Sequence, residues 1–528
     1  MTRPLVFNGI NGQTAEYLTP PMDLSRIARF AQGIRLSEQE YEDLASRVGS
    51  SYSIPYPTRD GVDPDDLAQS GWAMIFPAAD PGSRRARELD AIHEALAPLR
   101  AHRRAMATRH HEHLYREVRG EDGYRAGESK QRFLVRMGAG ASGPVDPDRL
   151  PYYLLLVGGP DEIPYHVQYQ LDVQYGVGRI HFDTPDEYAW YAESVVAAET
   201  GTGASGRQGP LEAVFFAVAN PDDRATFASS SLLTGPLADD IAARMAAEDL
   251  AASELAAANG SATHRRWNVS RFLAQDATKA QLASLLGDRA PAFLFTASHG
   301  LGFSPDSEWQ RQRQGALVCQ DWPGPGAKIE PDHYFAGEDI TEDADLGGLI
   351  AFHFACYGAG TPARDEFWRL ARKSPGERGP TELASKPFVA TLPKRMLGRR
   401  RGALACIGHV DRAWAGSFID SAPDREHGIA VNLAPFQTTI TRLLDGARLG
   451  HAMDPLDLRY AELASDLASQ IEDIETYAAE PDERALAMNW LLANDARNYA
   501  VIGDPAVRIQ QSGPDAAPAG TLATQQPR

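Results

Sequence analysis

The chain has 528 residues, which exceeds the size at which one hydrophobic core stops growing, so about two or three domains are expected. Its 43% hydrophobic and 23% charged residues are ordinary for a globular protein and exclude disorder as the default state. The 52 basic and 71 acidic residues give a net charge of −19, which argues against nucleic acid and anionic membranes as main partners.

The number and spacing of the cysteines, and the first residues of the chain, indicate the cellular compartment in which the protein is expected. Cys319, Cys356 and Cys406 are few and widely spaced, so neither a disulfide framework nor a zinc-ligand pattern is present, and we predict no metal. The first residues lack an apolar stretch of signal-peptide length, and no window approaches the roughly 20 apolar residues of a membrane span. We therefore expect reduced thiols, no membrane span and a cytoplasmic location.

Residues 1–150 form an amino-terminal α+β extension in our interpretation. The pattern predicts a helix at 36–48, a strand at 70–77 that is closed by proline, and a long helix over 84–119. No chemistry can be assigned to this region from its residues. We expect a structural or substrate-gating role, with room for a regulatory partner.

From residue 151 strands and helices alternate, which is typical of an α/β protein with a parallel or mixed sheet flanked by helices. We divide this part into an α/β subdomain (151–290), a catalytic domain (291–510) with a helical end, and a disordered tail (511–528). The predicted strands are 152–157, 177–182, 212–218, 264–270, 292–298, 349–355 and 402–409. The predicted helices are 185–200, 234–258 and 277–287, and 434–499 is mostly helical. A hairpin strand is predicted within 314–321.

Two apolar runs each end on a reactive side chain. One leads from Pro291 to His299 and Gly300, and the other leads from Leu349 to Cys356. Continuous apolar runs are typical of parallel strands covered on both faces, and ligands of such sheets bind beyond the carboxyl ends of the strands. The histidine and the cysteine are therefore predicted to lie on one rim of the sheet.

A thiol beside an imidazole is a recognised nucleophile–base pair. Cys356 is the predicted nucleophile and His299 the predicted base. Gly300 leaves room for a substrate backbone, and its amide, with that of Cys356, is a candidate donor to the oxyanion of a tetrahedral intermediate. His353 lies three residues before Cys356 and so on the opposite face of the strand, whereas His409 competes less well for the base role.

These two strand ends resemble the His-Gly and Ala-Cys strand ends of the caspase-like cysteine peptidases, a group that includes caspases, legumain and the gingipains. Further segments are similar to the gingipain-like branch, in the same order along roughly residues 150 to 510. They are Tyr152–Pro164, Gly178–Glu187 with its Gly-Arg strand, Ala403–Trp414, and Val501–Ile509 with its Gly-Asp-Pro closure. The resemblance implies a caspase-like fold and a cofactor-free cysteine endopeptidase. Gingipains are secreted as pro-forms, and the present amino terminus departs from that pattern.

The resemblance also implies a pocket for the side chain before the cleaved bond. Trp414 occupies the place of the tryptophan that forms a wall of that pocket, and Asp172 is the nearest match to the acid that selects arginine. Glu162 is a candidate acid for orienting the imidazole. The implied partner is a protein or peptide substrate, cleaved after Arg or Lys. The alternatives are a catalytically silent binding or scaffold protein with the same fold, and a transpeptidase that uses the same dyad.

Overall fold

The computed structural model describes residues 9–18, 58–201, 210–259, 266–365, 382–418, 431–477, 480 and 482–510. The predicted helix at 36–48 and the predicted disordered tail at 511–528 lie outside these residues. The helices formed by the described residues all fall short of the length and apolar character that crossing a lipid bilayer would require.

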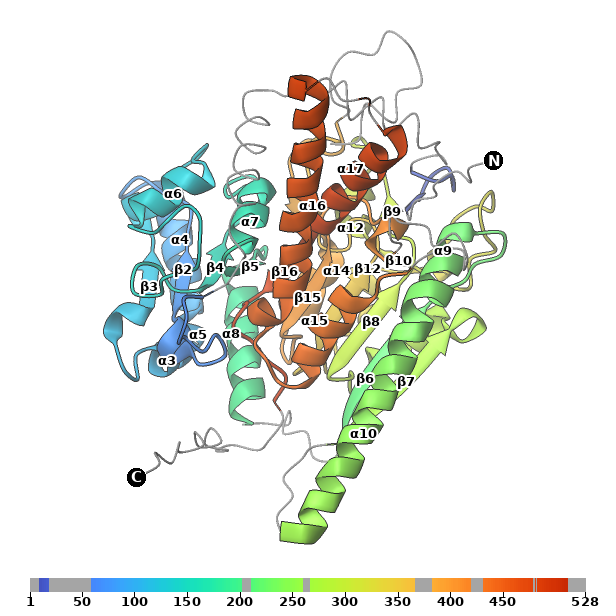
Figure 1. The fold of residues 1–528 in the computed structure, drawn as a ribbon, viewed down its shortest axis with the longest axis horizontal. Coiled ribbons are helices and arrows are strands. Elements are labelled where there is room, and N and C mark those ends of the chain that lie inside the picture. Colours follow the sequence, from blue (N-terminus) through green and yellow to red (C-terminus); the bar gives the residue numbers. More distant parts are fainter. Residues whose placement is uncertain are drawn as a thin grey trace.

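A ten-stranded sheet runs through the molecule (Figure 1). From one edge to the other its strands are β3 (Tyr115–Val118), β2 (Trp72–Ile75), β4 (Tyr153–Val157), β5 (Gly176–Ile180), β16 (Tyr499–Gly503), β15 (Ala405–His409), β12 (Ile350–Phe354), β8 (Phe293–Ala297), β6 (Leu211–Ala217) and β7 (Trp267–Leu273). The α/β fold class predicted from the sequence is thereby confirmed. All seven strands predicted beyond residue 151 are present, displaced by at most a few residues.

The sheet consists of two sets of parallel strands, with strand β16 between them. Strand β16 is antiparallel to β15, whereas the neighbouring strands within each set are parallel. The carboxyl ends of β15, β12, β8, β6 and β7 therefore share one edge of the sheet. The carboxyl ends of β4 and β5 lie at this edge too, because Trp72 at the amino end of β2 contacts Asp504, which follows β16 beside the amino end of β15.

Helices cover the sheet (Figure 1). Every residue of β4, β5, β8, β12, β15 and β16 is buried, which requires cover on both faces. The main helices are α4 (Arg84–Ala95), α5 (Ala97–Ala107), α6 (Lys130–Arg136), α7 (Tyr165–Asp172), α8 (Pro185–Thr200), α10 (Gly235–Asn259), α11 (Lys279–Leu285), α14 (Thr391–Leu397), α15 (Ala434–Leu444), α16 (Leu449–Tyr477) and α17 (Glu483–Arg497).

Helix α8 illustrates how closely local sequence can set an element. Thr184 and Glu187 form a capping box, Pro185 occupies the first turn, and Gly201 closes the helix in the left-handed region. The helix therefore begins and ends where the sequence predicts. By contrast, the predicted helix over 84–119 is wrong in its second half: Pro98 starts a separate helix, α5, and the following residues form β3 at the edge of the sheet.

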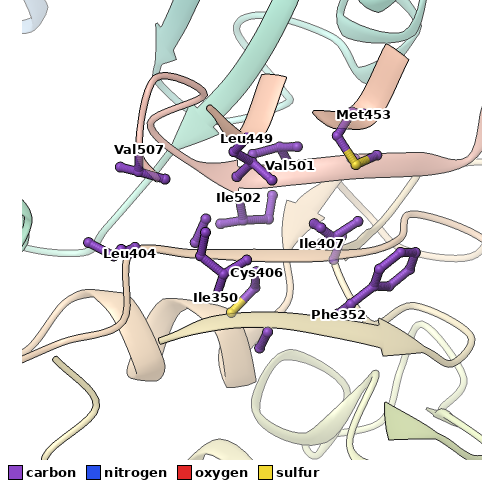
Figure 2. Packing of buried hydrophobic residues seen from close by; sticks show 14 of the residues in the cluster. Ile350, Phe352, Leu404, Cys406, Ile407, Leu449, Met453, Val501, Ile502 and Val507 are labelled. Carbon is purple, nitrogen blue, oxygen red and sulfur yellow. The ribbon is translucent and has the colours of Figure 1, made fainter. Parts of the chain in front are cut away.

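The core is continuous across β12, β15 and β16 in the middle of the sheet (Figure 2). Ile350 of β12, Cys406 of β15 and Ile502 of β16 lie on successive strands and are almost fully buried. Burial raises the pKa of the Cys406 thiol well above its ordinary value. Cys406 therefore belongs to the apolar packing of the protein and is a poor candidate for chemistry.

A buried charge cluster joins the amino-terminal region to the closing segment of the chain. The Arg103 guanidinium of α5 donates to Asp504 at 2.7 Å and to both oxygens of Glu199 at 2.6 and 2.8 Å. Trp72 of β2 also donates to Asp504, at 3.0 Å. Burial opposes ionisation of Glu199, but the charge of Arg103 outweighs it and lowers the pKa of this carboxyl.

Replacing Arg103 by alanine is expected to lower the free energy of unfolding by about 3 to 5 kcal/mol, because two buried carboxylates would lose their counter-charge. Denaturant unfolding at neutral pH measures this loss. Stability from the lowered pKa of Glu199 is present above the pKa of the unfolded state and is lost as the pH falls through the acid range. Arg84→Ala is the control: its ion pair with Glu88 is exposed, and its loss should leave stability essentially unchanged.

Candidate active site

His299 and Cys356 follow neighbouring parallel strands. His299 lies two residues beyond the end of β8, and Cys356 lies two residues beyond the end of β12, which pairs with β8 in register from Phe293 and Ile350 onward. Both side chains are 0% exposed. The sheet thus brings the two residues to one edge, where an imidazole and a thiol are enclosed together.

The two nitrogens of the His299 ring have different partners. Nδ1 accepts a hydrogen bond from the backbone N–H of Gly9 at 2.6 Å, and Nε2 lies 2.5 Å from Oδ2 of Asp223. Because Nδ1 is an acceptor, the proton of the neutral ring lies on Nε2 and is donated to the carboxylate. The ring is fixed between Tyr17 and Trp322, which it meets edge to face at 5.7 and 6.1 Å between centroids.

Asp223 is the acid that contacts the imidazole, and the sequence interpretation missed it. It lies six residues beyond β6, the neighbour of β8 at the same edge, and caps helix α9 (Arg224–Ala228). Burial opposes its ionisation, but the charge and hydrogen bonds of His299, Tyr17 and Thr226 lower its pKa to about 2. Asp223 could have been found from the sequence, because it is an acidic residue shortly after the predicted strand 212–218.

The Cys356 thiol is buried and sits at a sharp turn of the chain. Its Sγ accepts a hydrogen bond from the backbone N–H of Ala413 at 3.2 Å. Tyr357, the next residue, has a φ of 58°, in the left-handed region where a non-glycine residue is strained. Burial raises the pKa of the thiol to about 12, so the enclosed form holds a neutral thiol.

Gly300 is required for the close approach of the two strand ends. A methyl group at this position would lie 1.8 Å from the carbonyl oxygen of Cys356, far inside contact distance. The space that we expected for a substrate backbone is therefore taken by the backbone of Cys356. The roles of the Gly300 and Cys356 amides as oxyanion donors remain a proposal.

The loop after β15 forms a wall beside the thiol and is tied to α17. The backbone N–H of Trp414 donates to Asp495 at 2.8 Å, and Ser417 also hydrogen-bonds to this carboxylate. Trp414 is 2% exposed and directly follows Ala413, the residue that contacts Sγ. Trp414 therefore lies near Cys356, and its role as a pocket wall remains a proposal.

Glu162 and Asp172 have partners outside the dyad. Glu162 follows β4, which four strands separate from β8, and it pairs with Arg85 at 2.6 and 2.7 Å. Asp172 ends α7 just before the amino end of β5 and so lies towards the edge of the sheet opposite the dyad. Burial raises the pKa of Asp172, and the charges of Arg179 and Lys130 partly oppose this shift.

The other rim histidines are enclosed in the core. His353 faces Thr296, whose hydroxyl lies 2.8 Å from its Nδ1, and the His409 ring lies against Tyr499 at 4.2 Å between centroids. A cavity of about 150 Å³ is lined among others by Tyr165, Tyr169 and Asp411. Asp411 also accepts a backbone hydrogen bond from Tyr357, the residue after the nucleophile candidate, at 2.9 Å.

Comparisons with known proteins give similarity in structure only. No family model matches the sequence, and no curated protein matches it. Among solved structures, one described as "Structure of Protease" is similar at a TM-score of 0.40 and 11% identity, over 85% of this chain and 80% of that chain. A complex of Porphyromonas gingivalis RgpB pro- and mature domains is similar at a TM-score of 0.41 and 11% identity, over 84% and 80% of the two chains.

Proposed function

We propose that this protein is a cysteine-type endopeptidase that hydrolyses peptide bonds with a Cys356–His299 dyad. The observation that carries the proposal is the placement of one backbone residue, Gly9, against both side chains. Its N–H donates to Nδ1 of His299, and a methyl group on its Cα would lie 2.8 Å from Sγ of Cys356. A peptide backbone thus fits between the two groups that would act on it.

The proposed chemistry uses only side chains and amides of this chain. Nδ1 of His299 takes the proton of Cys356, and the thiolate attacks the carbonyl carbon of the substrate. Asp223 stabilises the protonated imidazole, and the amides of Gly300 and Cys356 hold the oxyanion. His299 then gives its proton to the leaving nitrogen, and water releases the acyl group from the sulfur. No cofactor is needed for these steps.

We propose that the substrate carries Arg or Lys before the cleaved bond, with Trp414 and Asp172 as pocket residues. Two cations of the protein, Arg179 and Lys130, already act on Asp172 electrostatically. Asp411 is a second candidate acid and is favoured by its position, because it follows β15 at the edge of the dyad and lines the cavity beside the loop of Trp414. A carboxylate facing a guanidinium in a bidentate pair would select arginine.

Asp411→Asn is expected to lower kcat/KM for peptides with Arg before the cut by about tenfold or more, since a charge-assisted pair would be lost. Peptides with uncharged residues at that position should be affected little. A peptide library, with products identified by mass spectrometry, measures both rates and also separates hydrolysis from peptide joining.

Asp172→Asn is the matched comparison for that experiment. An Arg-selective loss in Asp172→Asn with none in Asp411→Asn would assign the pocket acid to Asp172. Because Gly9 covers the dyad, absence of peptide turnover and of Cys356 labelling by an arginyl chloromethyl ketone would favour the scaffold alternative only if both persist in Gly9→Ala.

A further inference from the structure

The chain's own amino-terminal residues fill the space between His299 and Cys356. Residues 9–18 form a small hairpin, the N-terminal hairpin, in which Leu18 donates to the carbonyl of Gly9 at 3.0 Å and Asn11 donates to Glu16 at 2.8 Å. Its first strand, β1 (Ile10–Asn11), runs parallel to β9 (Leu301–Gly302), which directly follows the Gly300 turn. The hairpin therefore adds a strand to the segment that carries the candidate base.

The N-terminal hairpin makes both apolar and hydrogen-bonding contacts with the candidate site, as a bound peptide would. Ile10 is 0% exposed and belongs to a small apolar cluster with Leu301 and Trp322. Tyr17 donates to Oδ1 of Asp223 at 2.8 Å, on the oxygen that His299 does not use. Both ends of the hairpin thus engage the catalytic candidates.

Gly9 is the residue that this fit depends on. Its φ is 120°, a conformation that side chains with a Cβ rarely adopt. A methyl group on its Cα would lie 2.8 Å from Sγ of Cys356 and 2.8 Å from Leu18. Only glycine can therefore lie at this point without displacing the thiol or the hairpin.

The hydrogen bond of Gly9 also identifies which side of a substrate the hairpin occupies. In peptide hydrolysis the base must return its proton to the nitrogen of the leaving amine. The Gly9 nitrogen lies 2.6 Å from Nδ1 of His299, which is the nitrogen that performs this transfer. Residues from Gly9 onward therefore lie where the leaving half of a substrate would lie.

We infer that the N-terminal hairpin is a built-in peptide ligand that closes the dyad, and that substrates replacing it must carry glycine directly after the cleaved bond. The inference rests on the proposed function and adds both a regulation and a substrate class to it. With the hairpin docked, the lone pair of Nδ1 is occupied and Sγ is covered. Activity requires that the hairpin leave.

The accessibility of Cys356 tests the closure without any assay of turnover. Alkylation of the full-length protein by iodoacetamide, followed by mass spectrometry, should modify Cys356 at least about tenfold faster in Gly9→Ala than in the wild type, because overpacking of this size strongly disfavours the docked state. Leu18→Ala, which removes the contact on Gly9 and Gly302, should act in the same direction. Thr14→Ala, an exposed position of the same hairpin whose side chain bonds to Glu16 within it, should leave the rate unchanged.

Cys319 and Cys406 serve as internal controls, since both are buried and should stay unmodified in a folded variant. Rapid alkylation of Cys356 in the wild type, at the rate seen in Gly9→Ala, would overturn the closure. Faster alkylation in Gly9→Ala without cleavage of any peptide would support the closure and count against the peptidase.

The glycine requirement is tested with paired reporters in the Gly9→Ala protein. Peptides with glycine after the cleaved bond should be hydrolysed at least about tenfold faster than the same peptides with alanine there, since the added methyl group would collide with Sγ. Equal rates for the two reporters would overturn the substrate assignment while leaving the peptidase activity established.

Discussion

Replacing Cys356 by alanine is expected to abolish peptide hydrolysis, with a loss of at least about 10³-fold, because no other group can form the acyl intermediate. Reporter peptides with Arg or Lys before the cut and glycine after it measure this loss. The comparison is made both in the wild type and in the Gly9→Ala background, where the dyad is expected to be open. The fold should survive, since the contacts of the thiol with the backbone of Ala413 are weak sulfur hydrogen bonds.

Cys406→Ala is the matched control for this substitution. It removes a buried thiol of the same kind from the core between β12 and β16, at some cost in stability but without loss of turnover. Circular dichroism and thermal unfolding report whether each variant is folded. Hydrolysis that persists in a folded Cys356→Ala protein would contradict the proposed mechanism.

Much of the fold could be predicted because the information is local. Apolar runs of five to seven residues mark buried strands, and the caps of α8 fix both ends of that helix. The order of the strands in the sheet could not be predicted, because an apolar run carries no signal of which strand it will pair with. The choice of Glu162 as orienting acid depended on that order: four strands separate β4 from β8, whereas β6, which precedes Asp223, pairs with β8.

The same contrast between local and non-local information applies to the candidate site. His299 and Cys356 could be proposed from the sequence because each directly follows an apolar run. Asp223 was within reach by the same argument, applied to the strand beside β8. Gly9 could not be found, since its contact with His299 joins residues 290 positions apart and no local pattern encodes such a pairing. The residues of the site that could be predicted are therefore those with a local signal in the sequence. Gly9, which covers the dyad, comes from a distant part of the chain.

Asp223→Asn is expected to lower kcat by roughly 10²- to 10⁴-fold with little change in KM, because the amide cannot stabilise a charged imidazole and can fix the ring in the wrong tautomer. Asp223 acts through His299 and is a positioning residue, so partial rescue in Asp223→Glu would support its role. The pKa of Asp223 is lowered to about 2, so the carboxylate stays ionised at working pH.

The same lowered pKa gives a test of stability that does not depend on turnover. The free energy of unfolding contributed by Asp223 is fully present above the pKa of the unfolded state, near 4, and is lost as the pH falls towards 2. Wild-type stability should therefore decline more steeply over this range than that of Asp223→Asn, by about 2 kcal/mol in total. Two results together would contradict this role of Asp223: a parallel decline in the free energy of unfolding of the two proteins, and a normal kcat in Asp223→Asn. They would show that the carboxylate neither positions nor activates the imidazole.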